Sequence, residues 1–202
     1  HLDLAQGRRG TAGRAEGRPR GAAEAAKILC TSWRQALDIP DGRVENTFEN
    51  RMKVVRVLRE QRPRVVILPY WKGRHPDHYT ASVLGYEACF LSGLAKLDVA
   101  TKPHRPFKIV YATLYYDVRP TFVVDITEQF EARLESLMAY KTQFSDQEAG
   151  KGIFPARDEI RSRVEAMARF YGMLGGVTYA EPFLQKAVGL VEDLTLIPFQ
   201  SI

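Results

Sequence analysis

The sequence predicts an α/β fold with a mostly parallel sheet. Residues 46–61 repeat apolar side chains at helical spacing, Pro63 ends that pattern, and a short continuous apolar run, Val65–Leu68, follows. Strands of a parallel sheet read as continuous apolar runs when helices cover both of their faces, so this run predicts a strand buried on both faces. A helix, a tight turn and a buried strand in that order form the repeating unit of parallel α/β folds.

The remaining elements follow in chain order. Residues 1–4 resemble the end of a strand, and a loop punctuated by glycines leads to an alanine-rich helix over 22–29. Further helices are predicted from residue 76 to about 96, over 127–138 with Thr127 as N-cap, and over 156–174. Strands are predicted over 108–116 and 121–126, and the chain from Tyr179 onward reads as irregular.

Length and composition narrow the class of protein. The chain has 202 residues, of which 45% are hydrophobic and 26% charged, which predicts one globular domain over residues 1–202. No stretch approaches the roughly 20 consecutive apolar residues that a membrane span needs, so we expect no membrane partner. Two cysteines are too few for a disulfide framework, and they fit a reduced, cytoplasmic setting.

The positive charge is concentrated near the start of the sequence. Six Lys or Arg and three Asp or Glu fall within residues 1–27, and the rest of the chain is nearly neutral. A nucleic-acid-binding domain usually carries a basic face through its fold, so we expect no nucleic-acid partner. The glycine loop lacks the GxxxxGK[ST] pattern of a phosphate loop. Polyanion binding by the basic leader remains an alternative, and a strong loss of binding with salt would be its mark.

Residues 75–78, with the sequence His-Pro-Asp-His, directly follow the loop after the predicted strand at 65–68. Ligands bind at this edge of open α/β sheets. With Pro76 in the first turn of a helix, His75 and His78 project from the same side. Asp77 between them can orient one ring through its N–H. Such a pair indicates a metal or acid–base site, and the alternative is a polar helix cap at the surface.

The chain resembles the zinc-dependent N-acetylglucosaminyl deacetylases of the LmbE-like or PIG-L family. The resemblance is carried by the motif over 74–78 with its flanking helix, the glycine loop over 7–13 and the Ile-Pro-Asp-Gly turn over 39–42. Stretches over 117–126, 140–144 and 179–183 resemble the bacillithiol branch, whose members deacetylate N-acetylglucosaminyl-malate. The resemblance implies a Rossmann-like, three-layer α/β/α fold, a Zn²⁺ ion or another divalent metal, a small N-acetylglucosaminyl substrate and a homo-oligomer.

The resemblance also implies roles for individual residues. His78 corresponds to a zinc ligand, and His75 to the group that stabilises the oxyanion or protonates the leaving amine. Asp77 corresponds to the carboxylate that pairs with that histidine. Three further positions correspond to substrate contacts: Arg74, Arg18 and Asp41. Alternatively, Arg18 is a solvated arginine and Asp41 a turn-forming aspartate.

One part of the family pattern is missing from these residues. The family's AHPDD segment, which supplies two zinc ligands and the catalytic base, has no counterpart, because residues 75–77 are the only His-Pro-Asp in the chain. Residues 1–4 align with the family's second strand, so we expect an N-terminally truncated domain that lacks its first strand and helix. One ligand cannot hold a catalytic zinc ion, so we expect this chain alone to be inactive. A degenerate sugar-binding homologue without catalysis is the alternative, since Arg8 and Ala12 replace the Glu and Arg of the family loop.

Overall fold

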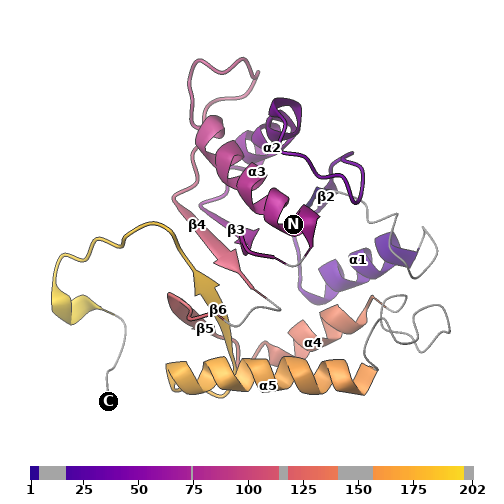
Figure 1. The fold of residues 1–202 in the computed structure, drawn as a ribbon, viewed down its shortest axis with the longest axis vertical. Helices are drawn as coiled ribbons and strands as arrows, with labels where there is room; N and C mark the ends of the chain where they lie inside the picture. The colour runs from indigo at the N-terminus through magenta and orange to yellow at the C-terminus, as the bar shows by residue number, and fades with distance from the viewer. Residues whose placement is uncertain (5–16, 74, 114–117, 141–156, 198–202) are drawn as a thin grey trace.

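The computed structural model describes residues 1–4, 17–73, 75–113, 118–140 and 157–197. Its strands form two ladders (Figure 1). The short strands β1 (Leu2–Asp3) and β2 (Gln35–Ala36) pair in parallel. The main sheet has the order β3-β4-β6-β5, with β3 at Val65–Pro69, β4 at Lys108–Ala112, β5 at Phe122–Asp125 and β6 at Ala180–Leu184.

Strand directions in the main sheet follow the prediction of a mostly parallel arrangement. β3 and β4 are parallel, with Val65 opposite Lys108 and Pro69 opposite Ala112. β6 is antiparallel to both β4 and β5, so β5 runs in the same direction as β3 and β4. The α/β fold class is therefore confirmed, with β6 as the reversed strand among those described.

Five α-helices are described alongside these strands. They are α1 (Gly17–Ile28), α2 (Phe48–Gln61), α3 (Pro76–Ser92), α4 (Phe130–Met138) and α5 (Arg157–Gly175). Helices α2 and α3 contact each other, and α3 packs against β3, whereas α5 packs against β5 and β6. Figure 1 shows these two groups of helices at opposite ends of the main sheet. No described helix is long and apolar enough to cross a membrane.

The buried apolar side chains form two clusters, one for each of these two groups of helices. The first joins α2 and α3 through buried side chains such as Val55, Leu84 and Ala88, and Val66 and Ile109 pack against it from the sheet. The second joins α4 and α5 through Phe130, Leu134 and Ile160. The first cluster fixes α3 on the sheet, and α3 carries both histidines of the predicted site at its beginning.

Burial of β3 differs from the prediction. The strand forms where the apolar run predicts it, but Val65 is 48% and Ile67 58% exposed. β3 is an edge strand of its sheet, and α3 covers the face that carries Leu68, whose side chain approaches Gly85 so closely that a Cβ there would lie 2.5 Å from it. The prediction that both faces of this strand are buried is therefore wrong for the described structure.

Two local predictions fail near β5 and β6. Thr127 does not cap α4, because Gln129 occupies the N-cap and the Thr127 hydroxyl donates to Asp125 Oδ1 at 2.6 Å instead. The segment after Tyr179 is not irregular at first but forms β6, which lies between β4 and β5. Pro182 hides this strand in the sequence, since proline is depleted in strands that pair on both sides.

Arg59 is a buried cation that fastens α2 to the end of α3. It is 3% exposed and donates to three well-placed carbonyl oxygens, those of Ser92 at 3.0 Å, Leu94 at 2.7 Å and Thr101 at 2.9 Å. The guanidinium is a second donor to Ser92 and Leu94, whose carbonyl oxygens also accept from the backbone N–H groups of His104 at 2.9 Å and Leu97 at 3.2 Å, so it ties α2 to the segment that follows α3.

We expect Arg59→Met to lower the free energy of unfolding by about 3 kcal/mol, since it removes several buried hydrogen bonds from a charged donor. Arg56→Met, on the exposed side of the same helix, is the matched control and should change it by less than about 0.5 kcal/mol. Urea denaturation followed by circular dichroism compares the two. Equal midpoints for the two variants would show that the Arg59 hydrogen bonds add nothing to stability.

Candidate active site

The predicted site lies where β3 leads into α3. Pro76 occupies the first turn of α3 and His75 is its N-cap, with φ −89° and ψ 129°. The Nδ1 atom of His75 accepts a hydrogen bond from the backbone N–H of Asp77 at 3.2 Å. An acceptor at Nδ1 leaves the proton of the neutral ring on Nε2, which points away from the helix backbone as a donor. His75 is therefore both a helix cap and an exposed imidazole, so the two interpretations of this residue are compatible.

His78 lies beside His75, as the spacing predicts. The two ring centroids are 5.1 Å apart and the ring planes are inclined by 32°. Desolvation by the surrounding protein is the main cause that lowers the pKa of His78, the charge of His75 lowers it further, and the Asp77 carboxylate opposes both. A lowered pKa favours the neutral imidazole, which is the form that binds a metal ion.

Asp77 is the buried member of the motif, at 9% exposure. Its Oδ2 atom accepts from the Gly42 backbone N–H at 2.7 Å and its Oδ1 atom from the Val44 N–H at 3.2 Å. The described hydrogen bonds of this carboxylate thus run to the turn over 41–44 and not to a histidine ring. Asp77 lies in the first turn of α3, where its side chain faces back toward this turn.

The same hydrogen bonds bring a second predicted residue to the site. Asp41 directly precedes Gly42, whose φ of +74° fits a turn that favours glycine. Because Asp77 holds the amides of Gly42 and Val44, the turn that carries Asp41 is fixed next to the beginning of α3. Asp41 and the histidine pair are therefore brought together through Asp77.

The structure does not describe the side chains of the two predicted arginines, Arg18 and Arg74. Arg18 lies in the first turn of α1, and its side chain is outside the described part of the structure. Arg74 itself lies outside the described residues, as do the glycine loop over 7–13 and the family-like stretch over 141–144. Their substrate-binding roles remain predictions.

An aromatic cluster next to the histidines was missed by the sequence reasoning. Trp71, in the loop between β3 and His75, packs edge-on against Tyr111 of β4 with centroids 4.7 Å apart. Lys186 Nζ lies 4.8 Å from the Trp71 ring, 5.2 Å from Tyr86 and 5.1 Å from Tyr111, so a cation sits over three rings. The loop sequence Pro-Tyr-Trp at a strand's carboxyl end could have indicated the rings, but nothing in the sequence links Lys186 to them.

Whether a metal ion fits at the beginning of α3 depends on the ligand atoms that the side chains there provide. Two imidazoles on adjacent turns, one with a lowered pKa, match the nitrogen ligands that zinc prefers. Within the described residues there is no group of three or more His, Cys, Asp or Glu side chains that could hold a metal ion. The residues present therefore fit one part of a zinc site, with His78 as the predicted ligand.

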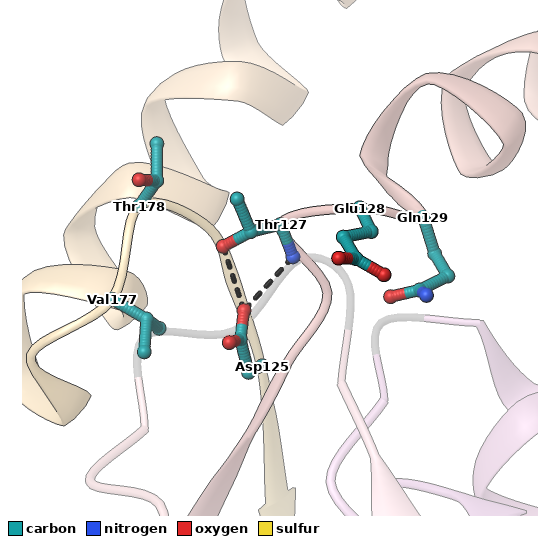
Figure 2. A pocket seen from close by; sticks show the side chains of 6 residues that line it. All are labelled: Asp125, Thr127, Glu128, Gln129, Val177 and Thr178. Atoms are coloured by element: carbon teal, nitrogen blue, oxygen red, sulfur yellow. Dashed lines mark hydrogen bonds between the residues drawn. The ribbon is translucent and has the colours of Figure 1, made fainter.

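A separate hollow of about 500 Å³ lies between the β5–α4 and α5–β6 connections (Figure 2). Its lining includes Asp125, Glu128 and Thr178. Hydrogen bonds from the Thr127 hydroxyl and backbone N–H to Asp125, drawn in Figure 2, lower the pKa of that carboxyl. The hollow shares no residue with the region around His75 and His78.

Comparison with known proteins gives a consistent result. The family model PIG-L, described as GlcNAc-PI de-N-acetylase, matches residues 3–89, which include the turn at 41–44 and the histidine pair. Diacetylchitobiose deacetylase of Thermococcus kodakarensis is 30% identical over 165 residues, 77% of this chain. The chain spans 57% of the length of that curated relative.

Two solved structures share the fold over most of the chain. The conserved protein TT1542 from Thermus thermophilus has a TM-score of 0.83 and 34% identity, and the match covers 94% of this chain and 82% of that one. The N,N'-diacetylchitobiose deacetylase from Pyrococcus horikoshii has a TM-score of 0.75 and 26% identity, over 90% of this chain and 70% of that one. With the His-Pro-Asp-His helix start in place, residues 3–89 match the PIG-L family model, and the chain is similar in sequence and fold to these proteins along most of its length.

Proposed function

We propose that the protein containing this chain hydrolyses the acetamide of an N-acetylglucosaminyl compound and releases acetate and the free amine. The observation that carries the proposal is the beginning of α3, where two imidazoles lie 5.1 Å apart next to a turn held by Asp77. The names of the matched relatives support the reaction class, since two of them are diacetylchitobiose deacetylases.

In the proposal this chain supplies a metal ligand, a hydrogen-bond donor to the reacting group and a substrate contact. In the proposal His78 would be a ligand of a zinc ion, which when bound polarises the amide carbonyl and activates water. In the proposal the neutral His75 ring donates a hydrogen bond from its Nε2–H to the oxygen that becomes negative. To protonate the leaving nitrogen, the ring would first have to take up a proton and become imidazolium, and Nδ1 would then give up the hydrogen bond that it accepts from the Asp77 N–H. Its Nδ1 is held by the Asp77 backbone N–H, so the ring orientation is set before substrate binds. In the proposal Asp41, on the turn that Asp77 holds, would contact a sugar hydroxyl.

We further propose that these 202 residues alone are inactive. The remaining ligands and the general base would come from an AHPDD segment, which this sequence does not contain. A catalytic zinc site takes three protein ligands, and His78 provides one of them.

A reduced cytoplasmic location is part of the same proposal and is supported by two cysteines that are both free.

The substrate is tested by acetate release from a panel of compounds. We propose N-acetylglucosaminyl-malate, because the sequence over 179–183 and 117–126 resembles the bacillithiol branch, and N,N'-diacetylchitobiose is the comparison compound. The product of the complete reading frame that contains these residues should release acetate from the malate conjugate with a higher kcat/KM. Preference for diacetylchitobiose would exclude the bacillithiol substrate but retain the reaction, and folded, zinc-loaded protein that releases no acetate from either would overturn both.

The 202-residue chain is assayed in parallel at equal concentration. We expect background acetate release and zinc binding well below one ion per chain. Catalytic acetate release with about one zinc ion per chain would show that the described histidines find their other ligands within these residues, and would refute the proposed inactivity.

A further inference from the structure

Lys186 contacts the loop that leads from β3 into α3, which we define as residues 70–73. It follows β6, the strand beside β4 in the main sheet (Figure 1). Its ammonium lies 4.8, 5.2 and 5.1 Å from the ring centroids of Trp71, Tyr86 and Tyr111, which are the contacts that the structure describes for it. A cation at this distance is attracted by the negative face of an aromatic ring, so each of the three rings holds the ammonium.

The three rings differ in how firmly their own elements are held. Tyr111 is 1% exposed on β4, and Tyr86 belongs to α3, which packs on β3 and α2. Trp71 instead lies in the loop, whose first residue is fixed by the hydrogen bond from the Tyr70 N–H to the Ala112 carbonyl at 2.9 Å. The Trp71 ring then packs edge-on against Tyr111, with centroids 4.7 Å apart. The cation over the three rings therefore ties the loop to both the sheet and the helix.

The other end of the loop lies against the histidine pair. Gly73 approaches α3 so closely that a Cβ there would lie 3.3 Å from the Cβ of His78 and 3.8 Å from the Tyr79 backbone nitrogen. His75, the N-cap of α3, follows Gly73 by two residues, and Arg74, the predicted substrate contact, stands between them in the sequence. The position of the loop therefore sets how the chain enters the predicted site, whereas His75 and His78 are held by α3 itself.

We propose that Lys186 is a positioning residue for substrate binding: through the Trp71 ring it holds the loop over 70–73 against the beginning of α3. The kinetic consequence rests on the proposed deacetylase function, whereas the structural consequence rests on the ring contacts alone. Without the cation the Trp71 ring leaves Tyr111 more readily, and the loop opens more often. Substrate affinity then falls because binding has to order the loop again, while the chemical step at the histidine pair is little changed.

Two variants of the complete protein separate the charge of Lys186 from its bulk. Lys186→Met keeps a long flexible side chain without the charge, and Lys186→Arg restores a cation that also binds aromatic rings. In Lys186→Met we expect hydrogen exchange of the amides over 70–73 to be about fivefold faster, KM to rise about fivefold and kcat to change by less than about twofold. Lys186→Arg should bring exchange and KM back close to the values of the unchanged protein. Lys108→Met removes an exposed cation at the other end of β4 and is the matched control, which should alter neither quantity.

A double variant tests whether Lys186 acts through Trp71. After thermal unfolding has shown that the variants are folded, Trp71→Leu should raise KM and the exchange rates at least as much as Lys186→Met does. Adding Lys186→Met to it should change them by less than about twofold further, because the ring on which the cation acts is already gone.

The proposal is overturned if Lys186→Met leaves exchange over 70–73 or KM unchanged, or if Lys186→Arg behaves like Lys186→Met. It is also overturned if Lys108→Met has the same effect, or if the effects of Lys186→Met and Trp71→Leu multiply in the double variant. Hydrogen exchange needs no turnover. Folded protein that releases no acetate would therefore overturn the proposed function, and the exchange rates would still decide whether Lys186 holds the loop.

Discussion

Replacing His75 by asparagine is expected to lower kcat of the complete protein by about 10²- to 10⁴-fold without a loss of stability. That range is the usual contribution of a positioned proton donor or acceptor. The prediction depends on the double position of His75, which caps α3 through Nδ1 while Nε2 faces outward. Asparagine is among the best N-cap residues, so it retains the cap and removes the imidazole.

His75→Ala provides the comparison that separates the two roles. Alanine removes both the imidazole and the cap, so we expect the same loss of kcat together with a loss of about 1 kcal/mol in stability. Steady-state kinetics and thermal unfolding of the two variants measure this difference. If His75→Asn retains full kcat, His75 is only a helix cap, and the assignment of an acid or oxyanion-stabilising role is wrong.

Replacing Asp77 by alanine is expected to release the turn over 41–44 and to reduce both stability and substrate affinity. The buried carboxylate accepts from two backbone amides, and its loss leaves the buried Val44 N–H and the part-buried Gly42 N–H without this acceptor. We expect about 2 kcal/mol less stability, faster hydrogen exchange at the Gly42 and Val44 amides, and a higher KM because Asp41 is no longer held. Asp38→Ala, which changes an exposed carboxylate just before the same turn, is the control and should alter none of these.

Asp77→Asn tests whether the Asp77 carboxylate acts mainly on the turn over 41–44 or on a histidine ring. The asparagine carbonyl oxygen can still accept from one amide, so partial protection of the turn and a smaller rise in KM are expected. If the variant instead lowers kcat while the exchange rates of Gly42 and Val44 stay unchanged, the carboxylate acts on a histidine ring, as the resemblance implied, and the turn is not its main contact.

The parts of the fold that rest on local patterns could be predicted from the sequence. The helix around residues 48–61 forms with Thr47 as its N-cap, and the strand at 65–69 pairs in parallel with the strand at 108–112, because their apolar patterns are strong and their ends are marked. β6 could not be predicted, because its partners lie 55 to 73 residues away and Pro182 weakens its local signal. The exposure of one face of β3 also depends on tertiary packing, because a continuous apolar run does not show which faces of a strand are covered by a helix.

The candidate site also combines features that the local sequence predicts with features that depend on tertiary packing. Three-residue spacing and a proline at the first helical position place His75 and His78 side by side, and the structure confirms this geometry. The contact of Asp77 with a turn 33 to 35 residues away depends on how α3 packs, so the sequence pointed to the adjacent histidines instead. Lys186 over Trp71 was missed for the same reason, because the two residues meet only through the placement of β6 beside β4.

The central claim, that the beginning of α3 is the metal-binding and proton-donating side of a deacetylase site, is tested most directly at His78. Zinc content and affinity are measured for the product of the complete reading frame, unchanged and with His78→Ala, after thermal unfolding has shown that both are folded. The account predicts about one zinc ion per unchanged chain, binding at least about 100-fold weaker in His78→Ala, and loss of acetate release in the variant. A folded His78→Ala protein that binds zinc as tightly as the unchanged protein and still releases acetate would contradict the account.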